Sequence, residues 1–130
     1  MILLRIGPKG KERPAILDKN GTIRDISSIV EDLNPFFLNF NLIEKLSKSN
    51  FESLNEISAK ERIGSCISKP GKFIAIGLNF LDHALETGAS PPTEPIIFMK
   101  ATSSICGPND DVEITPDSKK LDWEVELGII

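Results

Sequence analysis

The sequence lacks the features that mark membrane and secreted proteins. No apolar run approaches the roughly 20 residues that a membrane-spanning helix needs. The apolar start, Met1 to Leu4, is too short for the core of a signal peptide and has no basic segment before it. We therefore expect no membrane partner and a cytoplasmic protein.

Cysteine is also scarce, because the chain contains only Cys66 and Cys106, far apart in the sequence. The pair forms neither a C-x-x-C motif nor a zinc-ligand pattern. Two reduced thiols with a structural role, in a reducing compartment, are the simplest interpretation.

Basic residues are few in the second part of the chain. Residues 1–70 carry 11 Lys and Arg against 9 Asp and Glu, whereas residues 71–130 carry 4 against 10. A phosphate-binding surface needs clustered cations, so we expect no nucleic-acid partner. The acidic excess fits a cation site, and it fits an ordinary solvated surface equally well.

What is present is the pattern of a folded α+β protein rich in β-structure. Strands are expected at residues 1–6, 13–18 and 22–25, separated by glycine-containing turns. Helical segments are expected at 26–33, with Ser27 or Ser28 as the N-cap, and at 42–46 and 51–57. This order predicts a small α/β domain over residues 1–65, followed by a polar linker.

A second unit is expected over residues 70–130. Its predicted strands cover 72–78, 96–100, 112–115 and 121–130. A short helix, capped by Asn79 and ended by Gly88, should lie between the first two strands. Because Ile130 falls inside the last predicted strand, we expect this chain to be the front portion of a longer protein.

The last predicted strand carries two carboxylates that suit a metal ion. Glu124 and Glu126 are two positions apart, so their side chains share one face, about 7 Å apart at a strand rise of about 3.3 Å per residue. The apolar residues between and around them predict burial, and buried like charges need a cation between them. Mg²⁺ is the first choice, with Mn²⁺ or Ca²⁺ as alternatives. Alternating acids on an exposed strand are the competing interpretation.

His83 is the only histidine and can move protons near neutral pH. Glu86 follows three residues later, on the same face of the predicted helix, where a carboxylate can orient the imidazole. Three further residues are candidates for substrate contact: Asn79, Lys100 and Ser103. A surface histidine, a solvated lysine and a polar turn are the plain alternatives.

Several of these segments, in the same order, resemble the fumarylacetoacetate hydrolase (FAH) family. The resemblance rests on the runs 71–80, 82–84, 86–88, 94–100, 107–108 and 121–128. The first seventy residues resemble, more weakly, the small N-terminal domain of many bacterial members. The implied fold of residues 70–130 is the front half of a FAH-type mixed β-sandwich or roll. Phe80 stands where the family usually has tyrosine.

The resemblance implies metal-dependent cleavage of a C–C bond in a 2-oxo acid or a 1,3-dicarbonyl compound, such as an acylpyruvate. Glu124 and Glu126 match the metal-binding pair, and His83 and Glu86 match the pair that activates water. A third carboxylate ligand and a later lysine have no counterpart, so the chain alone is expected to be inactive. Family members usually form homodimers, which we expect of the full-length protein.

Other interpretations stay open. Relatives within the family include isomerases, decarboxylases and proteins labelled ureidoglycolate lyases, and no residue here selects among them. A different class is a non-catalytic metal-binding or assembly module. A third is a plain α+β domain with an acidic surface.

Overall fold

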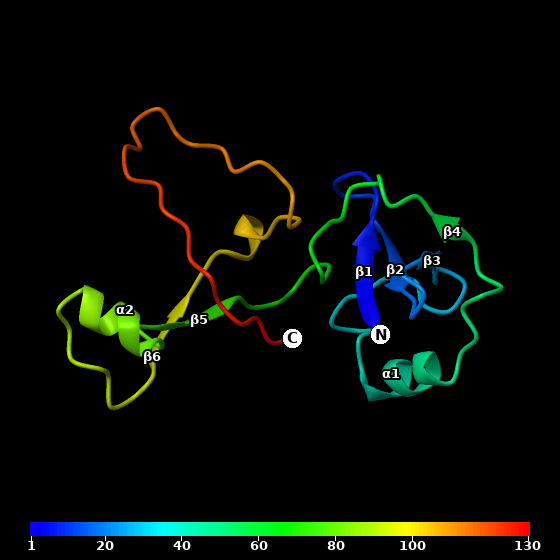
Figure 1. Cartoon of the computed structure of the whole chain (residues 1–130), viewed down its shortest axis with the longest axis horizontal. Coiled ribbons are helices and arrows are strands. Elements are labelled where there is room, and N and C mark those ends of the chain that lie inside the picture. The colour runs from blue at the N-terminus through cyan, green and yellow to red at the C-terminus, as the bar shows by residue number, and fades with distance from the viewer.

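The computed structural model describes all residues 1–130, and Figure 1 shows them as two parts lying side by side. The first part contains β1 (Ile2–Ile6), β2 (Arg13–Leu17), β3 (Ile23–Asp25), α1 (Phe40–Ser47) and β4 (Glu56–Ile57). The second part contains β5 (Ile74–Gly77), α2 (Leu81–Glu86), β6 (Ile96–Met99) and a 3-10 turn, Thr102–Ser104. The strand-rich α+β class is thus confirmed.

The first part is an antiparallel sheet in the order β1-β2-β3-β4. Asp18 shapes the β2–β3 turn, because its carboxylate accepts hydrogen bonds from the backbone amides of Asn20 and Thr22 at 2.8 and 2.9 Å. Gly21 completes the turn at φ 81°, a conformation that favours glycine. The three strands predicted here are confirmed, with boundaries that differ by one residue at most.

Helix α1 closes the main core. Asn39 starts the helix, where its side-chain oxygen accepts a hydrogen bond from the Leu42 amide at 3.1 Å. Leu42 and Leu46 then face a cluster of buried apolar side chains: Ile16, Ile26, Val30 and Leu33. The helical segment expected at 42–46 is confirmed as the centre of α1.

Two helical predictions in the first part are wrong. Residues 26–33 form a single turn, closed by the Val30 amide on the Ile26 carbonyl at 3.0 Å. The Asp25 and Asp32 carboxylates accept hydrogen bonds from the backbone amides of Ser27 and Leu33, respectively. Such side-chain-to-backbone bonds compete with the hydrogen bonds of a helix. The segment 51–57 makes a turn and then β4, because pairing with β3 outweighs local preference.

The second sheet consists of β5 and β6 alone, paired antiparallel from Ile74↔Met99 to Gly77↔Ile96. Both strands lie where the sequence predicts them. The apolar run at 72–78 is typical of a buried strand, and this expectation is wrong, because Ile74 is 51% exposed and only Ala75 of β5 is buried. Two strands cannot enclose a core of their own.

The strands predicted at 112–115 and 121–130 are absent from the structure. Both stretches have no regular secondary structure, and every residue from 111 to 130 is exposed. Trp123 is 78% exposed and Ile129 is 91% exposed, so the expected burial is also wrong. An extended segment becomes a strand only when a neighbour accepts its backbone hydrogen bonds, and none pairs with it here.

Neither helix of the chain is long and apolar enough to cross a membrane.

Candidate active site

A cleft of about 550 Å³ lies in the second part of the chain. It is bounded by the end of β5, by α2, by β6 and by the extended segment 122–126. Five of the residues predicted for the site line it: Asn79, His83, Glu86, Glu124 and Glu126. The structure therefore brings together two pairs that lie about forty positions apart in the sequence.

Helix α2 presents His83 and Glu86 to the cleft. The helix buries Ala84, while His83 and Glu86 are exposed. The positions are three apart and therefore share one side of the helix. No hydrogen bond joins the imidazole to the Glu86 carboxylate in this structure.

The expected cap of α2 is wrong. Phe80, not Asn79, is the N-cap residue, and no side chain bonds the free amides at this end. Asn79 belongs to the tight connection between β5 and α2, directly after Leu78 at φ 48°. Gly88, at φ 69°, ends the helix as predicted, in the left-handed conformation.

Glu124 and Glu126 reach the cleft from the extended segment. The Glu124 carboxylate lies 3.7 Å from the Lys100 ammonium group, and the two side chains are 60% and 38% exposed. Lys100 also lies over the rings of Phe73 and Phe98, at 6.0 and 5.9 Å from their centres. Lys100 therefore lies at the edge of the candidate site, in contact with one of the two carboxylates.

Ser103 is not part of this cleft. It lies in the 3-10 turn Thr102–Ser104, where it is exposed to solvent. The neighbouring Ser104 hydroxyl donates to the Ala101 carbonyl at 2.7 Å, a bond internal to the turn.

The cleft has the donor chemistry for a divalent cation without the complete geometry. Its carboxylates are the hard oxygen ligands that Mg²⁺ and Ca²⁺ prefer. No three His, Cys, Asp or Glu side chains come close enough together to hold a metal ion. Glu124 and Glu126 could supply two ligands, and the rest of a coordination shell would come from water, substrate or another segment.

Sequence reasoning missed the aromatic walls of the cleft. Phe80, Phe98 and Trp123 all line it. Phe98 had a usable signal, because in a strand it shares a face with Lys100 two residues later. Phe80 and Trp123 face the cleft only because a helix start and an irregular segment meet there, which no local pattern shows.

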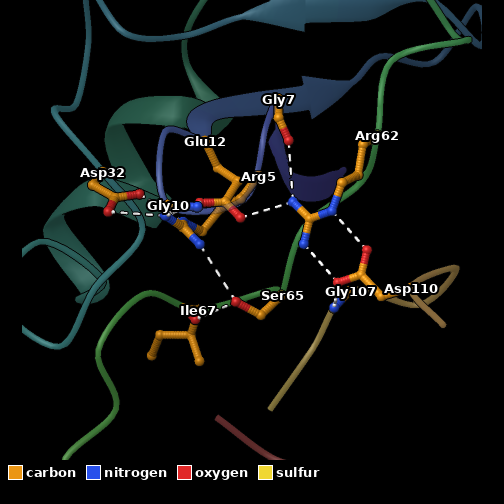
Figure 2. A network of polar contacts seen from close by, with 10 residues as sticks. All are labelled: Arg5, Gly7, Gly10, Glu12, Asp32, Arg62, Ser65, Ile67, Gly107 and Asp110. Atoms are coloured by element: carbon orange, nitrogen blue, oxygen red, sulfur yellow. Dashed lines mark hydrogen bonds and ion pairs between the residues drawn. The ribbon is translucent and has the colours of Figure 1, made fainter. Parts of the chain in front are cut away.

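The segment that carries the carboxylates follows a loop anchored on the first part of the chain, at Asp110. Figure 2 shows Arg62 at the centre of this anchor. Its Nε and Nη2 atoms donate to the two Asp110 oxygens, each at 2.6 Å, and its Nη1 donates to Glu12 at 2.8 Å. The Asp110 carboxylate also accepts the Gly107 amide at 2.8 Å.

These contacts set the charge states of the anchor. Hydrogen bonds from Arg62, followed by the one from the Gly107 amide, lower the pKa of Asp110 from 3.8 to about 2. The same carboxylate, followed by that of Glu12, raises the pKa of Arg62. For Glu12, burial opposes ionisation, but the hydrogen bond from Arg62 and other contacts prevail, and its pKa is lowered. All three groups are therefore charged at neutral pH.

A second, smaller cavity of about 260 Å³ lies in the first part, between the β2–β3 turn and the segment after α1. None of the predicted site residues lines it. Its lining offers no histidine, and its two acids, Asp18 and Glu52, belong to no group of three side chains that could hold a metal ion, so we assign it no chemistry.

Comparison with known proteins supports the resemblance of the second part of the chain to the fumarylacetoacetate hydrolase family. The sequence model of the family described as "Fumarylacetoacetate (FAA) hydrolase C-terminal" matches residues 72–130. A protein of Burkholderia ambifaria named "Putative hydrolase" is 51% identical over 130 residues, which cover all of this chain and 46% of that protein. Relatives from Burkholderia multivorans and Burkholderia cenocepacia are each 50% identical over the same lengths.

The three relatives match the same length of this chain. The chain aligns from end to end with each of these relatives and spans about half their length. The family match covers every residue that lines the cleft. Residues 72–130 are therefore similar to the fumarylacetoacetate hydrolase family.

Proposed function

We propose that the cleft is part of the active site of a divalent-cation-dependent hydrolase or lyase. The reaction is cleavage of a C–C bond in a 2-oxo acid or 1,3-dicarbonyl compound, such as an acylpyruvate. One observation carries the proposal: the cleft that lies wholly within the family match gathers His83, Glu86, Glu124 and Glu126. The proposal concerns a protein of the relatives' length, and we propose no turnover by this chain alone.

Two pairs of residues in the cleft have different roles in the proposed reaction. Glu124 and Glu126 would hold the cation, Mg²⁺ by preference and Mn²⁺ or Ca²⁺ otherwise, which when bound supplies Lewis-acid stabilisation of negative charge on a substrate oxygen. His83 would accept a proton from the attacking water, and Glu86 would orient the imidazole and favour its charged form. Water adds to the carbonyl carbon, the adjacent C–C bond breaks, and the carbon that takes the electron pair is finally protonated.

Lys100 and Asn79 would contact the substrate. Lys100 is the cation nearest to the two carboxylates, and its ammonium group is partly exposed at the edge of the cleft. An anionic 2-oxo acid needs such a partner beside a row of acids. Asn79 offers an amide in the cleft wall. Ser103 lies elsewhere, and we leave it out of this proposal.

The cation site is testable in the 130-residue chain itself, because Trp123 is the only tryptophan and lines the cleft. Millimolar Mg²⁺ should change the Trp123 emission and raise the melting temperature by mass action. The double variant E124Q/E126Q should lose both responses. The control variant E113Q should keep both responses, because Glu113 is exposed and lies outside the cleft. No response of the unaltered chain to Mg²⁺ would count against the site.

A second candidate function is a non-catalytic metal-binding or assembly module. Its specific support is that Glu124 and Glu126 line the cleft without a third ligand side chain close by, so another segment or chain would have to complete the site. It predicts that Mg²⁺ binds without any C–C cleavage, even when the chain is joined to the remaining part of a relative. Release of pyruvate from an acylpyruvate by such a joined protein would exclude it.

We also propose that the full-length protein is a homodimer. The support here is the amount of apolar surface left open on the second part, for example at Ile97 and Leu127, which are 67% and 85% exposed. Light scattering on a size-exclusion column measures the mass directly. A monomer across the micromolar range would refute the proposal.

A further inference from the structure

The two cysteines of the chain lie on either side of the contact between the first part and the loop anchored at Asp110. Cys66 and Cys106 are both free, and both are exposed to solvent. Neither is packed in a core, so the structural role expected from the sequence finds no support in the packing. Both thiols are open to reaction with small molecules in solution.

Cys66 belongs to a stretch that is fastened to the first part on both sides. The Gly64 amide donates to the Arg5 carbonyl at 2.7 Å. The Ser68 amide donates to the Leu33 carbonyl, also at 2.7 Å. Gly64 and Ser68 are buried, while Cys66 lies midway between them and is exposed. The backbone around this thiol is therefore held in place.

Cys106 is brought to this stretch by its neighbour Gly107. The Gly107 amide donates to the Asp110 carboxylate at 2.8 Å, and that carboxylate accepts two bonds of 2.6 Å from Arg62. Gly107 is packed so closely that a methyl group on it would lie 3.2 Å from the Gly64 Cα. Consecutive Cα atoms are about 3.8 Å apart, so each thiol is attached within two such steps of the contact.

We propose that Cys66 and Cys106 are a modification site, at which a reversible disulfide locks the loop 105–110 onto the first part of the chain. Figure 2 shows Ser65 and Gly107, the chain neighbours of the two cysteines, beside the anchor that holds this loop. A disulfide joins residues whose Cα atoms are about 4.4–6.8 Å apart. Because both cysteines are exposed and lie within two residues of the packed contact, the bond needs only local adjustment. Neither the cleft nor a cation takes part, so this site is independent of the proposed function.

The bond forms by thiol–disulfide exchange with a small disulfide such as oxidised glutathione. One cysteine attacks the small disulfide, which gives a mixed disulfide and releases one glutathione thiol. The other cysteine then attacks the mixed disulfide, which closes the bond between Cys66 and Cys106 and releases the second glutathione thiol. The two protein thiols are oxidised, the small disulfide is reduced to two thiols, and these take up both protons. A reducing compartment keeps the lock open.

Intact mass spectrometry of the 130-residue chain at increasing ratios of oxidised to reduced glutathione tests the site. We expect the chain to lose two hydrogen atoms, to carry no glutathione and to form no link to a second chain. After digestion with trypsin in the absence of reductant, one linked species should join the peptides 63–72 and 101–119. Cys66→Ser and Cys106→Ser each keep a single thiol, so both variants should stop at the mixed disulfide with glutathione.

The anchor should decide how readily the bond closes, because it holds the two thiols at a high effective concentration. Asp110→Asn should lower the equilibrium constant of the disulfide about tenfold, since the loop is then held less firmly beside Cys66. The glutathione ratio at which half of the chain is oxidised measures this constant. Asp117→Asn, which removes an exposed acid outside the loop, is the matched control and should leave the ratio unchanged.

The outcomes are decisive in both directions. An intrachain bond that Asp110→Asn weakens and Asp117→Asn does not would support the lock. A chain that carries glutathione at every ratio, or that links only to a second chain, would overturn it. An Asp110→Asn variant that closes the bond as readily as the unaltered chain would also overturn it, because the anchor would then have no part in bringing the thiols together.

Discussion

Arg62 donates two hydrogen bonds of 2.6 Å to the Asp110 carboxylate (Figure 2). This pair connects the first part of the chain to the loop that precedes the extended segment 122–126 of the cleft. The same guanidinium also donates to the Gly7 carbonyl at 3.1 Å. A planar guanidinium matches a carboxylate in two places at once, which fixes direction as well as distance. The position of residues 111–126 therefore depends on a side chain from the other part of the molecule.

Replacing Asp110 with asparagine should loosen this link. The amide keeps the shape but loses the charge and one acceptor, so we expect a lower melting temperature and an altered Trp123 emission. Asp117→Asn is the matched control, because Asp117 is exposed and forms no ion pair. Equal melting curves for both variants would show that the contact carries no stability.

The contribution of Asp110 should depend on pH in a defined window. Its pKa is about 2 in the folded chain against an ordinary value of 3.8, so the folded state favours the ionised form. The stabilisation is complete above the ordinary value and is lost as the pH falls from about 4 toward 2. Urea unfolding at several pH values measures it. The difference between the unaltered chain and Asp110→Asn should shrink across this window, and a difference that stays constant would contradict the assignment.

Gly107 allows the loop to approach the first part of the chain. A methyl group at this position would collide with the Ile63 carbonyl oxygen and lie 3.2 Å from the Gly64 Cα. Gly107→Ala should therefore destabilise the packed loop, by about 1–3 kcal/mol as for other overpacked sites. Gly71→Ala is the control, because a methyl group there meets nothing within 4 Å. Thermal melts that rank the two variants equally would argue against a tight contact.

The role of His83 is best tested in a protein that joins this chain to the remaining part of the Burkholderia ambifaria relative. His83→Asn should lower the hydrolysis rate of an acylpyruvate about 10²–10⁴-fold, the usual loss when a general base is removed. Glu86→Gln should reduce the rate less, because it acts through the imidazole. Glu94→Gln, outside the cleft, serves as the control. A rate within threefold of the unaltered protein for His83→Asn would remove the histidine from the mechanism.

Local patterns predicted the hairpin strands and the sheet strands β5 and β6 well. In the β2–β3 turn, Asp18 and Gly21 act within a few residues of each other, so their effect is readable from the sequence. The helix expected at 26–33 is absent, because the Asp25 and Asp32 side chains bond the neighbouring backbone, and Asp32 is also held by Arg5 at 2.7 Å, a partner 27 positions away that no local pattern reveals. Its apolar residues do face a core, but from a turn.

The candidate site divides in the same way. His83 and Glu86 share a side of α2 because three residues separate them, which the sequence states directly. Glu124 and Glu126 reach the same cleft, yet the strand expected to carry them is absent, because strand formation needs a neighbour. The pairing of Arg62 with Asp110 joins positions 48 apart, and no spacing rule reveals it.

The six largest fully buried side chains all lie between Ile6 and Leu46, in the first part of the chain. A measurement that reports on that core alone would pass a sample in which the cleft has lost its structure. Quality control of this protein therefore has to read the two regions separately. A preparation can have a folded core and still bind no ligand in the cleft.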